Sequence, residues 1–205
     1  MNHDFEPQLH PASIAALRPT QMTVGFREVA RKRAEWRKRA QADGPDFLGR
    51  HLIPVVLGPQ GKFFVLDNHH LALALHEEQV EHVLVKIVAD LSRLEKPLFW
   101  TFMDNRAWLH PFDAAGQRCP RNRLPKTVDG LLDDPYRSLA GELRRAGGCA
   151  KDETPYAEFL WADFLRHRID GKILERDFQA ALALALAACH QRDASYLPGW
   201  CGPET

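Results

Sequence analysis

The sequence predicts an α+β fold in which a compact unit of strands and helices is followed by a helical C-terminal half. Two apolar runs, residues 53–57 and 63–66, flank Gly58-Pro59-Gln60-Gly61 and predict two antiparallel strands joined by a turn. A helix-forming stretch at 68–78 and a Val- and Ile-rich alternating stretch at 82–89 come next. The later segments predict only helices and loops, which places the sheet in the first half of the chain.

Length and composition limit the possible classes of protein. The 205 residues fit one domain, or a compact domain with an appendage. With 45% hydrophobic and 26% charged residues, the chain is not a largely disordered protein. Its 27 basic residues balance 27 acidic ones, so no overall field draws it to nucleic acid or to an anionic membrane. Any such binding requires a local patch.

The first 42 residues contain an irregular segment followed by a helix-forming segment. Residues 1–16 hold two histidines and two prolines with little periodicity, and we expect a loosely attached arm. Residues 25–42 predict a helix, ended by Gly44-Pro45, with seven basic and two acidic side chains between 27 and 39.

Asp67 occupies the position expected for the N-cap of the helix at 68–78. The resulting order through residue 90 is helix, strand, turn, strand, helix, strand.

The second half predicts helices at 97–108, 135–146, 155–168 and 174–191, with a proline-containing loop at 109–127. Pro135 and Pro155 support two of the helix starts, and Gly147-Gly148 ends one helix. The tail after residue 192 has no regular pattern. Trp200, together with the C-terminal helix, is expected either to form a dimer contact or to cover the core of its own domain. We expect an arm at 1–16, a core at 17–95, a helical extension at 96–192 and a tail at 193–205.

The junction after the second strand is the most informative segment. Phe63-Phe64-Val65-Leu66 runs through Asp67-Asn68-His69-His70 directly into a helix. Helix N-termini present unpaired N–H groups and a positive dipole end, which suit a phosphate. Two imidazoles add hydrogen-bond donors, metal ligands or an acid or base near neutral pH. In the alternative interpretation Asp67 only caps the helix, one histidine packs and the other is solvated.

Several strings resemble those of the putative ParB-like nuclease family over about residues 17–168. They are Leu17-Arg18-Pro19-Thr20-Gln21, Val24-Gly25, Ile53-Pro54-Val55-Val56-Leu57-Gly58-Pro59, Asp67-Asn68-His69-His70, Asp134-Pro135-Tyr136-Arg137-Ser138-Leu139-Ala140 and Glu158-Phe159-Leu160-Trp161-Ala162-Asp163-Phe164-Leu165-Arg166. The resemblance implies a ParB/sulfiredoxin-like fold, a small mixed sheet with helices, shared with ParB N-terminal domains, sulfiredoxins and ParB-related free-serine kinases.

In that superfamily the strand-to-helix junction binds nucleotide phosphates. The resemblance therefore implies Asp67, His69 and His70 as catalytic candidates and Asn68 as a ligand contact. The serine kinases carry a similar Asp-Gly-His-His-Arg string, whereas this chain has Asn68 for the glycine and Leu71 for the arginine. A bidentate guanidinium clamp on phosphate is therefore missing from this turn. The word nuclease in the family name is itself an inference from distant relatives.

Further ligand contacts are expected elsewhere in the chain. The candidates are Gln21, Lys32, Arg123, Arg137 and Ser138. Arg123 belongs to a run of four bases, with Arg118, Arg121 and Lys126, in the loop at 109–127, and we expect this loop to close over the Asp67 junction. Asp134 and Pro135 have a structural explanation as an N-cap and first helical residue, and Arg137 and Ser138 then lie in the first turn.

The leading hypothesis is a protein that binds a phosphorylated ligand, a nucleotide, at the junction 67–70, with phosphoryl transfer or phosphoester hydrolysis as the expected chemistry if it is an enzyme. Magnesium would enter with a nucleoside triphosphate, held by phosphate oxygens and by a carboxylate such as Asp67. The alternative hypothesis is a non-catalytic DNA-binding or partner-binding module that uses the basic helix 27–39 and the loop 118–126.

Other classes are excluded by motifs that the sequence lacks. It has no G-x-G-x-x-G, Walker-type, G-x-S-x-G or H-E-x-x-H motif. Its four cysteines form no C-x-x-C pair, which favours buried or idle thiols over a zinc site or redox dithiol. The longest apolar stretch, 180–189, is about half of the roughly 20 residues that span a bilayer. The N-terminus has no signal-peptide pattern, and we expect a cytoplasmic location without membrane contact.

Overall fold

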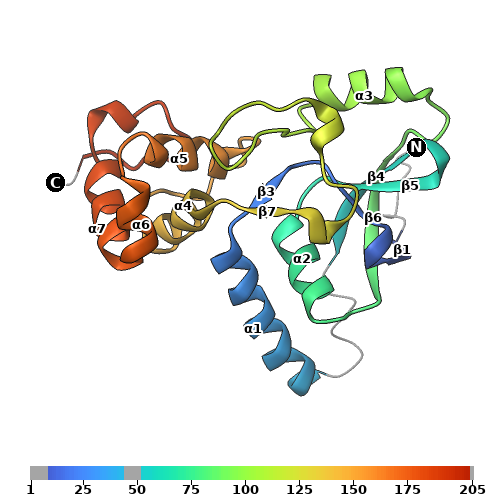
Figure 1. Ribbon diagram of the computed structural model, residues 1–205, viewed down its shortest axis with the longest axis horizontal. Helices are drawn as coiled ribbons and strands as arrows, with labels where there is room; N and C mark the ends of the chain where they lie inside the picture. The colour runs from blue at the N-terminus through green and yellow to red at the C-terminus, as the bar shows by residue number, and fades with distance from the viewer. Residues whose placement is uncertain (1–8, 44–51, 204–205) are drawn as a thin grey trace, which may run out of the picture. The chain divides into compact units, whose positions relative to one another are not determined.

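The computed structural model describes residues 9–43 and 52–203, and Figure 1 shows them as a ribbon. The described chain divides into two compact units. The first unit holds the described residues up to Thr23, with Val29–Asp113 and Gln117–Leu132. The second holds Val24–Glu28, Ala114–Gly116 and the described residues from Asp133 onward. The domain boundaries expected from the sequence stay predictions.

The first unit is built on a five-stranded mixed sheet, which confirms the predicted α+β class. Its strands are β1 (Leu9–Ser13), β2 (Arg18–Pro19), β4 (Ile53–Gly58), β5 (Lys62–Val65) and β6 (His82–Asp90), in the order β1-β6-β4-β5-β2. The β1–β6 and β4–β5 pairs are antiparallel, and the β4–β6 and β5–β2 pairs are parallel. A separate two-stranded sheet joins β3 (Thr23–Val24) and β7 (Leu132–Asp133).

The side-chain alternation of β4 and β5 separates the two faces of this sheet. Val56 lies opposite Phe64, and both pack with Phe99 of α3 (Lys96–Asn105). Their neighbours Val55 and Val65 point to the other face and are fully buried. Figure 1 shows α2 (His69–Glu77) on the opposite side of the sheet from α3. The sheet is therefore covered by a different helix on each face.

The hairpin and the first helix form as predicted. The β4–β5 turn is a short helical turn, Pro59–Gly61, in which Gln60 and Gly61 have φ values of 64° and 68°. The basic helix is α1 (Phe26–Asp43). The predicted N-cap of α2 is wrong by one residue: the cap is Asn68, in the left-handed conformation at φ 65°, a region that asparagine tolerates better than most residues. Asp67 instead accepts a hydrogen bond from the Asn68 N–H (2.6 Å).

The predicted flexible arm is wrong for its described part. Residues 1–8 lie outside the described residues, but Leu9–Ser13 forms the edge strand β1, paired with β6 along five residues. Ile14 N–H then donates to the Glu81 carbonyl (3.0 Å), which continues the contact beyond the strand. The segment lacks strand periodicity, because pairing with a distant strand determines its conformation.

The second unit is helical, as predicted for the C-terminal half. Its helices are α4 (Pro135–Arg145), α5 (Ala157–Arg166), α6 (Gly171–Arg176) and α7 (Phe178–Cys189). The predicted helix 174–191 is wrong as a single element: Asp177 caps α7 by accepting from the Gln179 and Ala180 N–H groups, which divides the segment into α6 and α7. The helix predicted from Pro155 begins later, after Tyr156 in the left-handed conformation (φ 62°).

The core of the second unit lies between α4, α5 and α7, with Leu139, Leu143 and Leu165 fully buried. Trp200 packs against this core and donates from Nε1 to the Cys189 carbonyl (2.9 Å), so it covers the core of its own unit. Cys149 and Cys189 are buried there, and Cys201 is exposed. Within the described residues, no helix has the length and apolar character needed to cross a membrane.

Candidate functional site

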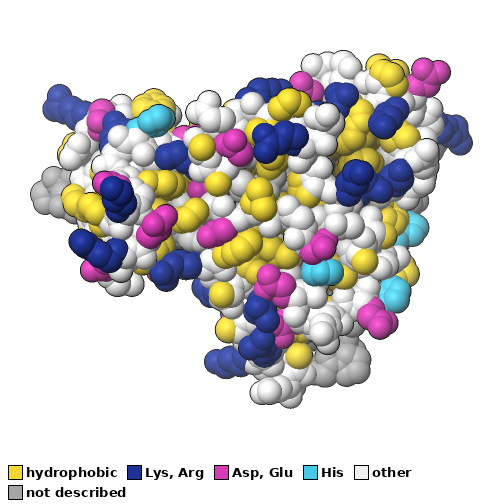
Figure 2. Space-filling model, viewed as in Figure 1, with side chains coloured by type: hydrophobic (Ala, Val, Ile, Leu, Met, Phe, Trp, Pro, Cys, Tyr) yellow, Lys and Arg dark blue, Asp and Glu magenta, His cyan; other side chains and the backbone are white. Residues whose placement is uncertain are grey.

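A hollow of about 800 Å³ opens on the α3 side of the first unit's sheet. Three segments line it: the β2 and β5 strand edges with the Pro59–Gly61 turn, helix α3, and the loop around residues 120–126. Its volume falls in the range of about 300–1,000 Å³ that is typical of small-molecule sites. Figure 2 shows Lys and Arg side chains around an apolar hollow in the part of the view where Figure 1 draws α3, β4 and β5.

The floor of the hollow is aromatic. Trp100 stands edge-on to Phe64 (centroids 5.3 Å apart) and to Phe99 (5.0 Å). Phe64 and Phe99 are buried and fix the position of the half-buried Trp100. Arg121 from the loop lies over the Trp100 ring, with Cζ 5.1 Å from the ring centroid. One face of the indole is therefore already occupied by a planar cation.

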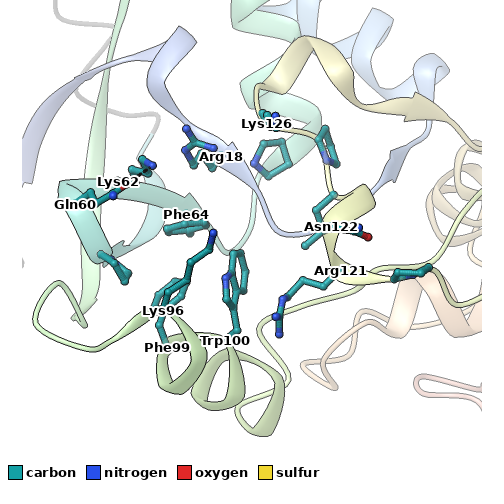
Figure 3. A pocket seen from close by; sticks show the side chains of 15 residues that line it. Arg18, Gln60, Lys62, Phe64, Lys96, Phe99, Trp100, Arg121, Asn122 and Lys126 are labelled. Carbon is teal, nitrogen blue, oxygen red and sulfur yellow. Dashed lines mark hydrogen bonds between the residues drawn. The ribbon is translucent and has the colours of Figure 1, made fainter.

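Basic side chains surround this floor. They are Arg18, Lys62, Lys96, Arg121 and Lys126, and Figure 3 shows them around Trp100 and Phe64. None of the described residues that line the hollow is acidic. Within the described ranges, no ion pair joins any of these five cations to a carboxylate, and Lys62 hydrogen-bonds only the amide oxygen of Gln60 (2.5 Å). The whole chain has no net charge, so the positive charge around the hollow is a local excess.

The predicted junction has a different geometry. His69 is 3% exposed, and its Nε2 accepts a hydrogen bond from the Thr20 N–H (3.2 Å). Because a backbone N–H can only donate, Nε2 must be the unprotonated nitrogen of a neutral imidazole. Thr20 Oγ1 also donates to the Val65 carbonyl (2.5 Å). The structure therefore brings the Thr20-Gln21 and His69-His70 strings together, and His69 ties α2 to the segment that follows β2.

The other junction residues differ in exposure. Asp67 is exposed, His70 is half-buried, and Asn68 donates from Nδ2 to the Leu52 carbonyl (3.1 Å). Gln21 is buried and donates from Nε2 to the Thr23 carbonyl (3.0 Å). The roles of these residues in catalysis or ligand binding stay predictions. No group of three or more His, Cys, Asp or Glu side chains suited to a metal ion occurs in the described part of the chain.

Three arginines of the basic helix, Arg31, Arg33 and Arg37, form ion pairs within the first unit. Arg33 and Arg37 both bind Glu78 at the end of α2 (2.6 and 2.7 Å), and Arg33 also reaches Glu77 (2.7 Å). Hydrogen bonds from Arg37 hold the pKa of the Glu78 carboxyl at about 2. Lys32 lies on the same helix, half-buried. These pairs neutralise part of the basic face that the DNA-binding hypothesis requires.

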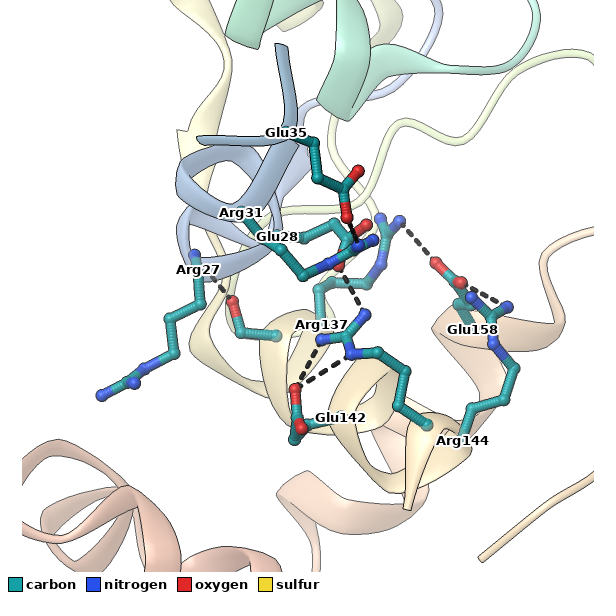
Figure 4. Close-up of polar contacts among 10 residues, drawn as sticks. Arg27, Glu28, Arg31, Glu35, Arg137, Glu142, Arg144 and Glu158 are labelled. Atoms are coloured by element: carbon teal, nitrogen blue, oxygen red, sulfur yellow. Dashed lines mark hydrogen bonds and ion pairs between the residues drawn. The ribbon is translucent and has the colours of Figure 1, made fainter. Parts of the chain in front are cut away.

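Arg137 and Ser138 lie in the second unit. Arg137 is 5% exposed, its guanidinium lies 3.5 Å from the Phe159 ring centroid, and Nη2 is 3.6 Å from Glu158 (Figure 4). Ser138 Oγ accepts from the Arg27 N–H (3.3 Å), and a Cβ on Gly25 would come within 2.5 Å of that oxygen. Packing thus accounts for Gly25, Arg137 and Ser138, which belong to strings that resemble the family. The ligand-binding role of Arg137 and Ser138 stays a prediction.

The aspartate that caps α4 belongs to the same unit. Asp134 is 2% exposed, accepts from the Tyr136 N–H (3.0 Å) as predicted, and pairs with Arg166 (2.6 Å). Burial raises the pKa of this carboxyl, and the charges of Arg166 and Arg137 oppose that rise. The network is that of a buried structural ion pair.

The sequence predicts part of the lining of the hollow. The basic loop is predicted to contribute a ligand contact through Arg123. Its neighbours Arg121 and Lys126 line the hollow, whereas Arg123 contacts the Cys119 sulfur (3.5 Å). The junction residues 67–70 do not line the hollow. Arg18, Lys62, Lys96 and Trp100 were not selected. The sequence signals near them are the family-like string at 17–21, which contains Arg18, and the aromatic stretch 97–108, which contains Trp100.

This chain matches a known protein family and a solved structure. The family described as "Putative ParB-like nuclease" matches residues 10–167, and the chain belongs to it. The crystal structure of protein Atu1540 from Agrobacterium tumefaciens is similar to this chain, with a TM-score of 0.90 and 52% identity over 97% of this chain and 100% of that chain. None of the curated proteins matches.

A more distant solved structure is the C-terminally truncated chromosome-partitioning protein ParB from Caulobacter crescentus, complexed with CTP-γ-S. It aligns over 88% of this chain and 93% of that chain at 13% identity, with a TM-score of 0.31. That similarity is too low to support a functional comparison.

Proposed function

We propose that this protein binds a phosphorylated ligand that carries a flat ring, a nucleotide, in the basic and aromatic hollow beside α3. The observation that carries the proposal is the arrangement of five cations around an aromatic floor without an acidic side chain among the described lining residues. Like charges gathered without counter-charges repel one another, and an anion between them removes that cost. Phosphate oxygens suit Lys and Arg, and a base suits the face of Trp100.

The hollow supports binding rather than chemistry. Its described lining residues include no histidine, carboxylate or hydroxyl group, so lysine amines are the only usual acid, base or nucleophile among them. They also offer no carboxylate to magnesium, and a magnesium ion at this place would be held by the ligand's own phosphate oxygens. The junction 67–70 is the location that the family resemblance implies. We favour the hollow because the one deeply buried group at the junction, His69, already accepts a hydrogen bond from Thr20.

Titration calorimetry with AMP, adenosine and ribose phosphate tests this proposal. We expect AMP to bind more tightly than either fragment, because only AMP uses both the cations and the indole. Arg121→Gln should weaken AMP binding by about ten-fold, the effect of losing one charge-assisted contact. Lys86→Gln, at an exposed lysine of β6 outside the hollow, is the matched control and should leave the affinity unchanged.

Three outcomes would count against the proposal. The absence of AMP binding at millimolar concentration refutes it. Equal losses in Arg121→Gln and Lys86→Gln would show a non-specific charge effect. A loss in His70→Gln without a loss in Arg121→Gln would move the site to the α2 junction.

A further inference from the structure

Arginines lie over aromatic rings at three places along α3 and the loop that follows it. Arg121 covers Trp100 (5.1 Å to the ring centroid), Arg106 covers Trp108 (5.1 Å) and Arg118 covers Phe112 (5.7 Å). We call these three pairs the stacking strip. Only the first pair belongs to the hollow. The other two continue the same chemistry outside it, and the proposed function does not use them.

All three arginines are exposed, and all three rings are half-buried. A half-buried ring is held by its own packing: Trp108 contacts Phe102 (5.8 Å), and Phe112 stacks on His110 (4.5 Å). The guanidinium groups above the rings are exposed, and exposed arginines lose little free energy when they exchange one partner for another. A ligand can therefore displace an arginine from the ring and use it as a phosphate contact.

The strip is continuous with α3. Arg118 Nη2 lies 3.3 Å from Asp104 Oδ1, which holds the Phe112 pair against the helix that carries Trp100. Asp104 is the one carboxylate that contacts an arginine of the strip among the described residues, and the side chains of Arg118 and Asp104 are both more than half exposed (60% and 53%). An ion pair so exposed stabilises little and competes weakly with phosphate.

We infer that the stacking strip binds single-stranded nucleic acid, with one nucleotide in the hollow and its neighbours on the Trp108 and Phe112 pairs. The inference rests on the proposed function for the hollow and extends it from one nucleotide to a strand. Aromatic faces with interleaved cations are the arrangement by which proteins hold single strands, since each base offers a flat face and each link a phosphate.

A duplex does not fit this surface chemistry. Its bases are stacked on one another and show only their edges, so three aromatic faces would find no partner. Amide side chains that could read base edges are few, Gln60 and Asn122 in the hollow. We therefore expect binding that tolerates many sequences and discriminates strongly against double strands.

Fluorescence anisotropy with labelled oligothymidylate and oligouridylate of about 12 nucleotides, within the usual site size of a single-strand module, tests the inference. The double variant Arg106→Gln/Arg118→Gln changes the strip only outside the hollow. We expect it to weaken binding of both oligonucleotides by about ten-fold or more while AMP binding stays within about two-fold. Phe112→Leu should weaken oligonucleotide binding in the same direction, and Lys86→Gln should change neither. The ratio of the two oligonucleotide affinities measures the combined effect of the 2′-hydroxyl and the thymine methyl group.

The two proposals fail separately. If AMP does not bind, the proposed function fails, whatever the oligonucleotides do. If AMP binds and the double variant holds the oligonucleotides as tightly as the parent, the strip is not a binding surface and the inference is overturned. Equal affinity for a duplex of the same length, or displacement of the oligonucleotides by an acidic peptide at similar concentration, overturns it as well, because it would show a charge surface without base stacking.

Discussion

The buried imidazole of His69 shows how a residue of a family motif can act through structure. Its Nε2 accepts from the Thr20 N–H, and Thr20 in turn donates from Oγ1 to the Val65 carbonyl. A backbone N–H that loses its acceptor in a buried place costs about 1–3 kcal/mol. His69 therefore stabilises the contact between α2 and the β2 segment, independently of any ligand.

We expect His69→Ala to lower the free energy of unfolding by about 2 kcal/mol or more, because it leaves the Thr20 N–H without its acceptor and opens a cavity. Asp67→Asn, two residues away and exposed, is the matched control and should change stability by less than about 0.5 kcal/mol. Urea unfolding followed by circular dichroism measures both. Equal stabilities of His69→Ala and the parent would contradict the structural role.

At the scale of elements, α1 and α2 are held together by charges. Arg33 and Arg37 share Glu78, and hydrogen bonding to Arg37 is the main reason that the pKa of Glu78 is about 2 instead of its ordinary 4.5. A carboxyl with a lowered pKa stabilises the folded state only while it is ionised. Its contribution is therefore complete above about pH 4.5 and declines as the pH falls towards 2.

Urea unfolding at a series of pH values tests this coupling. The parent should lose stability between about pH 4.5 and pH 2, and Glu78→Gln should lose less over the same interval, because it has no proton to bind there. Near neutral pH the variant should be the less stable of the two. Glu35→Gln, whose carboxylate pairs with Arg31 within α1, controls for a general loss of surface charge. Parallel curves for parent and Glu78→Gln would rule out this role for Glu78.

The sequence predicts elements that depend on local signals and misses those that depend on distant ones. The β4–β5 hairpin and the Asp134 cap follow from turn and capping residues, and both form as predicted. Strand β1 has no local signal, since Pro11 and two small residues give no strand pattern, and β6 determines it by pairing. The break between α6 and α7 has a local signal, the capping residue Asp177. The alanine and leucine content around it nevertheless predicts one continuous helix.

The residues that line the hollow show the same difference between local sequence signals and contacts of distant segments. The basic run in the loop at 118–126 is a local pattern, and two of its members do line the hollow. Arg18, Lys62 and Lys96 come from three separate segments, and no spacing in the sequence relates them. Only the pairing of β2 with β5 and the packing of Phe99 on Phe64 bring them together. A site assembled from single residues of distant segments leaves no motif to find.

The whole molecule has a formal net charge of zero, with 27 basic and 27 acidic residues. A neutral protein exerts little attraction on a polyanion at long range, so the salt dependence of binding should report only local contacts. For a single strand, each phosphate neutralised contributes about −0.7 to the slope of log affinity against log salt. The hollow and the strip therefore determine the slope, and the remaining surface does not.

We expect oligothymidylate affinity to fall with rising salt, and the slope to become shallower by about 1.4 in Arg106→Gln/Arg118→Gln, because two phosphate contacts are removed. Lys86→Gln should keep the parent slope, since its cation lies outside the hollow. The measurement is a set of anisotropy titrations between about 50 and 200 mM salt, where counterion release is readily resolved. A slope that changes equally in both variants would assign the salt dependence to the general surface, and a slope near zero would mean that the cations beside α3 hold no phosphates.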